Sequence, residues 1–135
     1  MGYVFDASAI FIGFKRGMEE IIAGNYTLNL VVFEIGNAIW KEVSVYKSIP
    51  LNKALEILDT ISDLLDLMTI IKMDKLNKDI LRIAENLGIT YYDAAYIYTA
   101  KQIKAPLITE DRKLISAAKN KVDIKILCLE DLQYQ

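Results

Sequence analysis

The sequence contains no histidine and a single cysteine, Cys128, among its 135 residues. The lack of histidine excludes Ser-His-Asp and Cys-His catalytic groups, and it removes the imidazole general base. A lone cysteine forms neither an internal disulfide nor a multi-cysteine zinc site. If the protein is an enzyme, carboxylates, lysines or a metal ion must therefore carry its chemistry.

Long apolar runs and an excess of positive charge are missing as well. No stretch approaches the roughly 18 apolar residues of a membrane-spanning helix, and the first residues lack a signal-peptide pattern. We therefore expect a cytoplasmic protein without membrane contact. The 16 basic and 18 acidic residues give a net charge of −2, which weakens nucleic-acid binding on charge alone but is compatible with a local basic patch.

Hydrophobic residues are abundant and periodically arranged. They make up 53% of the chain, which argues against disorder, and we expect residues 1–135 to form one domain with a real core. Short β-rich runs predict strands at residues 2–5, 27–32, 69–72, 106–109 and 125–129. Helices are expected at 7–14, 18–23, 33–46, 52–68, from 74 or 77 to 87 before Gly88, at 90–104 and at 111–119. This alternation predicts an α/β fold with a parallel sheet and helices on both faces.

The helix expected over residues 52–68, with Asn52 as its cap, has an unusually wide apolar face. Its main stripe contains Leu51, Leu55, Leu58, Ile61, Leu65 and Met68, widened by Ala54, Ile57 and Leu64. Core packing explains part of this face. A surface for a second copy or another protein would explain the rest, and the sequence leaves both interpretations open.

Four acidic residues lie at the starts of predicted helices. Asp6, Glu34 and Asp111 follow predicted strands, whereas Asp93 lies in the first turn of the helix that begins near Thr90. Each residue alone is explained as a helix cap, because carboxylates accept hydrogen bonds from free N–H groups and oppose the helix dipole. Thr90 and Asp93 also resemble a capping box.

The four carboxylates together indicate more than capping. Strand ends place three of them at one edge of the sheet, and Asp6 and Asp111 would flank the point where strand order reverses if the first strand is central. Converging carboxylates repel one another unless a cation lies between them. A donor set made of oxygens suits Mg²⁺ or Mn²⁺, which activates water and binds phosphoryl oxygens. The pattern thus favours metal-assisted hydrolysis of a phosphodiester.

Four stretches in order resemble the PIN-domain family, and within it the VapC-type toxins of prokaryotic toxin–antitoxin pairs. They are VFDAS at 4–8, FEIGNA at 33–38, TYYDAAY at 90–96 and LITEDRKL at 107–114. The resemblance implies a three-layer α/β/α sandwich around a parallel sheet of about five strands. It also implies a Mg²⁺- or Mn²⁺-dependent endoribonuclease that forms homodimers and is silenced by a small antitoxin covering the site.

The same resemblance assigns roles to individual residues. Asp6, Asp93 and Asp111 would be the chief metal ligands, and Glu34 would bind metal directly or through water and help to orient the attacking water. Three further positions match residues that support the acidic set, namely Ser8, Asn37 and Thr109. Asn37 would face the same way as Glu34, one helical turn away. A surface role for Asn37 and a strand role for Thr109 are the plainer explanations.

Candidate contacts to RNA are fewer. The basic residues best placed for phosphate are Arg112 and Lys113, beside Asp111, followed by Lys15 and Arg16. Solvated surface charge is the plainer explanation for all four. Unpaired bases would find stacking faces among Tyr91, Tyr92, Tyr96 and Tyr98, although helical spacing places some of these rings in the core.

Two other functions remain open on the sequence. One is a PIN-like module that binds RNA or protein without cleaving. The other is a receiver-like signalling domain, but the chain lacks the adjacent acidic pair expected after the first strand. An Asp-x-Asp phosphatase is disfavoured because Ser8 occupies the second acidic position.

Overall fold

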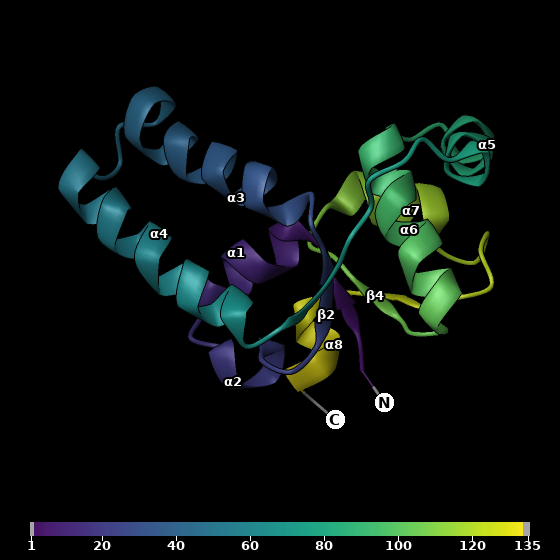
Figure 1. The fold of residues 1–135 in the computed structure, drawn as a ribbon, viewed down its shortest axis with the longest axis horizontal. Helices are drawn as coiled ribbons and strands as arrows, with labels where there is room; N and C mark the ends of the chain where they lie inside the picture. The colour runs from purple at the N-terminus through teal and green to yellow at the C-terminus, as the bar shows by residue number, and fades with distance from the viewer. Residues whose placement is uncertain (1, 134–135) are drawn as a thin grey trace.

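The computed structural model describes residues 2–133 and is built on a parallel sheet of five strands (Figure 1). The strands are β1 (Val4–Phe5), β2 (Tyr26–Leu28), β3 (Thr69–Ile71), β4 (Leu107–Ile108) and β5 (Ile126–Leu127). They lie in the order β3-β2-β1-β4-β5, and every neighbouring pair is parallel. This confirms the predicted α/β fold and places β1 at the centre.

Helices cover both faces of the sheet, as expected. One layer contains α1 (Ala7–Lys15), α2 (Glu19–Ile22), α3 (Val31–Trp40), α4 (Leu51–Asp66) and α8 (Leu129–Gln133). The other contains α5 (Lys78–Leu87), α6 (Tyr91–Ile103) and α7 (Arg112–Ala118) (Figure 1). The chain moves from β1 outward to β3 and then returns across the sheet to β4 and β5. Right-handed crossovers in opposite directions place their helices on opposite faces.

The sheet separates two halves of the hydrophobic core. Phe5 and Ile108 face the α1–α4 layer, whereas Val4 and Leu107 face the α5–α7 layer, and all four side chains are fully buried. Successive side chains of a strand point to opposite faces, so a strand covered on both sides needs a continuous apolar run. The short apolar runs of the sequence were therefore the correct signal for strands.

Several predicted boundaries were wrong. β2 ends at Leu28, and α3 begins at Val31 instead of residue 33, because Val31 and Ile35 pack one helical turn apart in the core and override the β preference of the run. A π-helical segment, η1 (Lys41–Val45), continues α3. α4 begins directly after Pro50, so Asn52 is not its cap. The five-residue helix α8 was not predicted, since it is too short to show periodicity.

The wide apolar face of α4 divides between core and surface. Ala54, Ile61, Leu64, Leu65 and Met68 are buried, in line with core packing. Leu51, Leu55 and Leu58 remain 62%, 53% and 44% exposed, and Figure 1 shows α4 extending with α3 beyond the sheet. Within residues 2–133, no helix is both long and apolar enough to span a bilayer.

Local capping signals were correct at the helices that carry the second layer. Asn77 Oδ1 accepts a hydrogen bond from Ile80 N at 3.0 Å, and Thr90 Oγ1 accepts one from Asp93 N at 3.1 Å. Gly88 ends α5 with a φ of 67°, a left-handed conformation that glycine adopts without strain. The contacts between α5 and α6 then fix the position of α6.

Asn77→Ala is expected to lower the free energy of unfolding by about 1 kcal/mol, because Ile80 N loses its acceptor at the start of α5. Chemical denaturation followed by circular dichroism measures this change. Asn86→Ala, an exposed position on the same helix, is the matched control and should change stability by less than about 0.5 kcal/mol. Equal losses in both variants would contradict the capping role.

Candidate active site

Asp6 is held at the carboxyl end of the central strand. It follows β1 directly and caps α1, where its Oδ1 accepts hydrogen bonds from Ala9 N at 2.9 Å and from Ser8 Oγ at 2.7 Å. Only 5% of the residue is exposed. The same side chain therefore starts a helix and presents a buried carboxylate at the sheet edge.

Two hydroxyl groups join this turn to the one after β4. Ser8 Oγ lies 3.3 Å from Thr109 Oγ1 and accepts a hydrogen bond from Glu110 N at 3.0 Å. Thr109 Oγ1 in turn accepts one from Asp111 N at 3.1 Å. Because β1 and β4 are neighbours, these contacts fix Asp6 and Asp111 relative to each other. Ser8 and Thr109 thus connect the two turns that carry Asp6 and Asp111.

Asp111 caps α7, with Oδ1 accepting hydrogen bonds from Lys113 N at 2.9 Å and Leu114 N at 3.3 Å. Its neighbour Glu110 also links separate elements. The Oε1 atom of Glu110 pairs with Arg16 at 3.2 Å, and its Oε2 atom accepts a hydrogen bond from Leu129 N at 3.0 Å. The turn that carries Asp111 is therefore attached to the end of α1 and to α8.

Glu34 and Asp93 are brought to the same edge by a contact that the sequence did not reveal. The Tyr96 hydroxyl donates a hydrogen bond of 2.7 Å to Glu34 Oε1, across 62 positions of the chain. Tyr96 lies one helical turn after Asp93 on α6, and Glu34 lies in the first turn of α3. Tyr96 is therefore a buried positioning residue, and its ring is not available for stacking.

The pKa values show that the four carboxylates form one electrostatic group. Burial raises the pKa of Asp6 to about 6, despite hydrogen bonds from Thr109, Ser8 and Ala9 that lower it, and the charge of Glu34 adds to the increase. Burial and the charge of Asp93 raise the pKa of Glu34. Burial and the charge of Asp111 raise the pKa of Asp93. Such mutual repulsion is the condition that a bound cation relieves.

The donor set fits a hard divalent ion by its chemistry, since all four side chains offer carboxylate oxygens. Among residues 2–133, however, no three acidic or cysteine side chains are already gathered closely enough to hold a metal ion. The structure thus brings the four predicted residues to one edge as electrostatic neighbours, without a finished coordination sphere.

A hollow of about 340 Å³ adjoins this group. It is lined by Leu30, Phe33, Glu34, Asn37 and Tyr92, so Asn37 faces the same way as Glu34, as predicted. Phe33, which also lines this hollow, was not among the site residues predicted from the sequence. A signal was available, because Phe33 directly precedes Glu34 just as Tyr92 directly precedes Asp93.

The candidate cations differ in their surroundings. Lys15 pairs with Glu42 at 2.9 Å, and Arg16 pairs with Glu110 at 3.2 Å. Arg112 and Lys113 are exposed at the start of α7, and neither forms an ion pair within the part of the chain that the structure describes. These two residues are accordingly the better placed pair for a phosphate group near Asp111.

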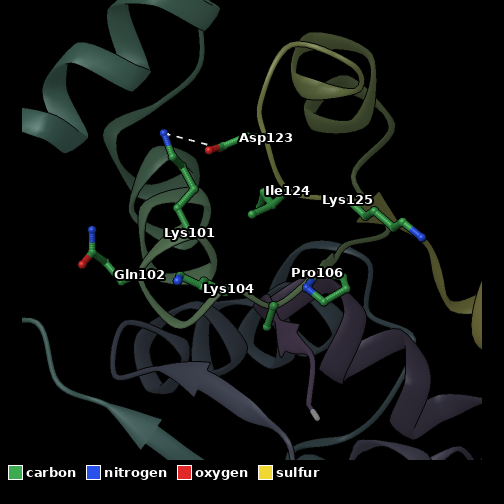
Figure 2. A pocket seen from close by; sticks show the side chains of 8 residues that line it. Lys101, Gln102, Lys104, Pro106, Asp123, Ile124 and Lys125 are labelled. Carbon is green, nitrogen blue, oxygen red and sulfur yellow. Dashed lines mark ion pairs between the residues drawn. The ribbon is translucent and has the colours of Figure 1, made fainter.

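A roomier hollow of about 660 Å³ lies away from the carboxylates (Figure 2). Pro106 and Lys125 line it just before β4 and β5, which places it at the opposite edge of the sheet. Its lysines do not converge, because Lys101 turns to Asp123 at 3.7 Å while Lys125 extends away (Figure 2). This hollow therefore offers no cluster of charges comparable to that at the carboxylate edge.

Comparison with known proteins points to one family. The family model described as PIN domain matches residues 3–120. The chain is 30% identical over 136 aligned positions to Exonuclease VapC9 of Pyrobaculum aerophilum, covering 93% of this chain and 92% of that protein. It is 29% identical over 122 positions to Ribonuclease VapC3 of the same organism, covering 84% and 92% respectively.

Solved structures show the same arrangement of elements. The crystal structure of PAE2754 from Pyrobaculum aerophilum matches with a TM-score of 0.77 and 26% identity, covering 99% of this chain and 95% of that one. A toxin–antitoxin complex from Klebsiella pneumoniae matches with a TM-score of 0.56 and 17% identity, covering 87% and 92%. The second likeness concerns the fold alone.

In the metal-free protein, the Asp6 carboxyl is expected to destabilise the fold less as the pH falls from 7 to 4. Below about pH 4, Asp6 is protonated in both the folded and the unfolded protein. Between about pH 4 and 6, Asp6 keeps its proton only in the folded protein. Above about pH 6, Asp6 is ionised in both, and the folded protein bears the full cost of burying the charge. The raised pKa of Asp6, about 6 against 3.8, corresponds to roughly 3 kcal/mol.

Asp6→Asn should therefore raise the free energy of unfolding at pH 7 by roughly 2–3 kcal/mol and change it little at pH 4. Asparagine caps helices as well as aspartate, so the start of α1 is preserved. Urea denaturation in EDTA at both pH values measures the effect, with the exposed Asp59→Asn as control. If Asp6→Asn were less stable than the unaltered protein at pH 7, the buried charge of Asp6 would not be destabilising.

Proposed function

The chain belongs to the PIN-domain family, and from that premise we propose that it is a metal-dependent endoribonuclease, the toxin of a VapBC-type toxin–antitoxin pair. The observation that carries the proposal is the arrival of Asp6, Glu34, Asp93 and Asp111 at one sheet edge, where each is coupled by charge to the next. Relatives named as VapC nucleases support a hydrolytic activity on nucleic acid.

A Mg²⁺ or Mn²⁺ ion would be held by Asp6, Asp93 and Asp111, with Glu34 bound directly or through water. When bound, such an ion activates a water molecule and neutralises charge on a phosphoryl oxygen. The raised pKa values of Asp6, Glu34 and Asp93 support this assignment, because a nearby cation favours the ionised carboxylates that repulsion and burial disfavour.

The remaining polar residues of the site would position this acidic set and the substrate. Ser8 and Thr109 hold the Asp6 and Asp111 turns together, and Tyr96 holds Glu34. Burial and the charge of Glu34 raise the pKa of the Tyr96 hydroxyl, so that it remains a donor at neutral pH. Arg112 and Lys113 would bind phosphate groups of the RNA beside Asp111. Their positive charges would attract the RNA to a site whose other charged residues are acidic.

The proposal includes a cytoplasmic homodimer and a small antitoxin partner. The VapC relatives support the antitoxin. Apolar side chains left exposed on α3 and α4, among them Val32, Trp40, Leu51 and Leu55, support contacts with protein partners. The complete acidic set favours cleavage over the alternative of a silent PIN-like binding module.

Asp93→Asn is expected to reduce RNA cleavage by at least about a hundredfold. Changing a residue that only supports a metal ligand already lowers activity by up to about a hundredfold, and Asp93 would be a ligand itself. Its fold should persist, because Thr90 caps α6 through the backbone N–H of residue 93. Cleavage of structured and unstructured RNA is measured with Mg²⁺, Mn²⁺ or EDTA, while circular dichroism monitors folding.

Asp123→Asn is the matched control, since that carboxylate lies at the opposite edge of the sheet, and it should cleave like the unaltered protein. Circular RNA distinguishes internal cleavage from removal of terminal nucleotides, because only an endonuclease opens a circle. Metal-dependent cleavage retained by Asp93→Asn would remove this residue from the site, and cleavage in EDTA would contradict metal dependence.

A further inference from the structure

Two exposed aromatic rings flank the acidic group from different layers of the fold. Phe33 is 77% exposed at the start of α3, and Tyr92 is 60% exposed at the start of α6. Each ring directly precedes one of the site carboxylates, Glu34 in the first case and Asp93 in the second. A single exposed ring is common on protein surfaces, but two that frame one hollow beside a site are a more specific arrangement.

The rings share two adjoining hollows. The first, of about 340 Å³, is lined by Glu34 and Asn37 together with both rings. The second, of about 240 Å³, is again lined by Phe33 and Tyr92 and continues to Met73 and Tyr91. The hydrogen bond between Tyr96 and Glu34 joins the helices that carry the two rings. The hollow thus lies between two helices that a hydrogen bond connects, so few protein groups would have to become ordered when a ligand binds.

The lining specifies the chemistry of an occupant. Aromatic faces offer stacking to a planar group, and the Asn37 amide offers both hydrogen-bond donors and an acceptor to a polar edge. The Glu34 carboxylate disfavours a phosphate in the same hollow. A planar heterocycle with a polar edge, whose attached phosphate lies toward the metal-binding carboxylates, meets all three conditions.

We propose that Phe33 and Tyr92 form a stacking site for one unpaired base of the RNA substrate, next to the phosphate that is cleaved. This inference rests on the proposed function and names the two residues that would contact a base. A base within a duplex has its faces stacked and its pairing edge occupied, so it cannot enter the hollow. Phe33 and Tyr92 thereby act as substrate-binding residues that contact a base directly.

The test compares oligoadenylate and oligouridylate with an abasic oligonucleotide of the same length, which keeps the charged backbone and lacks the bases. Fluorescence anisotropy measures binding with Ca²⁺ in place of Mg²⁺ or Mn²⁺, because Ca²⁺ also takes carboxylate oxygens as ligands, and gel electrophoresis checks that the strands stay intact. The unaltered protein is expected to bind the strands with bases about tenfold more tightly than the abasic strand. Phe33→Leu and Tyr92→Leu, which keep apolar bulk and lose the ring, should each reduce that ratio severalfold.

Two matched variants should keep the full ratio. Tyr92→Phe retains the stacking face, and Tyr46→Leu removes an equally exposed ring that follows η1 and lies outside both hollows. An unchanged ratio in both ring variants, or no preference of the unaltered protein for bases, would overturn the proposal. Ring variants that bind RNA normally but lose self-association in sedimentation would reassign the rings to a protein contact.

The outcome is separable from that of the proposed function. Metal-dependent cleavage by the unaltered protein, together with ring variants that discriminate bases normally, refutes the stacking site alone. Absence of both binding and cleavage for all RNA probes refutes the nuclease and the stacking site together.

Discussion

The burial of neighbouring carboxylates at one edge of a parallel sheet is the constraint on which the candidate site depends. Burial, and to a lesser extent repulsion between neighbouring charges, disfavours the ionised forms of Asp6, Glu34 and Asp93, yet the fold places them there. Hydrogen bonds from Ser8, the backbone of α1 and Tyr96 hold these oxygens in position. The surrounding hydrogen bonds therefore hold the carboxylates in an arrangement that is itself unfavourable. Such locally destabilising arrangements are common at functional sites.

Features that depend on neighbours in sequence were predictable. The caps supplied by Asn77, Thr90 and Asp111, and the end of α5 at Gly88, are local interactions within a few residues. The alternation of apolar runs and helical periods likewise specified a parallel sheet, because both faces of such strands are buried. With β1 central, Asp6 and Asp111 had to follow neighbouring strands, so half of the acidic group was implied by topology.

Features that depend on distant contacts were not predictable from the sequence. The hydrogen bond between Tyr96 and Glu34 joins residues 62 positions apart, and no local sequence pattern around either residue predicts it. The early start of α3 follows from tertiary packing of Val31, which outweighs the β preference of the preceding run. The division of the α4 face into buried and exposed parts depends on how far the helix extends beyond the sheet. The role of Phe33 depends on a hollow that exists only once α3 and α6 are assembled.

The two core halves contribute equally to the acidic group. Asp6 caps α1 and Glu34 lies in α3 of one layer, whereas Asp93 lies in α6 and Asp111 caps α7 of the other. A small sliding of α3 or α6 over the sheet would therefore move Glu34 or Asp93 away from Asp6 and Asp111, which the contacts between the turns after β1 and β4 hold together. The geometry of the site therefore depends on how both layers pack on the sheet. A partner that shifts a helix of one layer would alter that geometry without contacting a carboxylate.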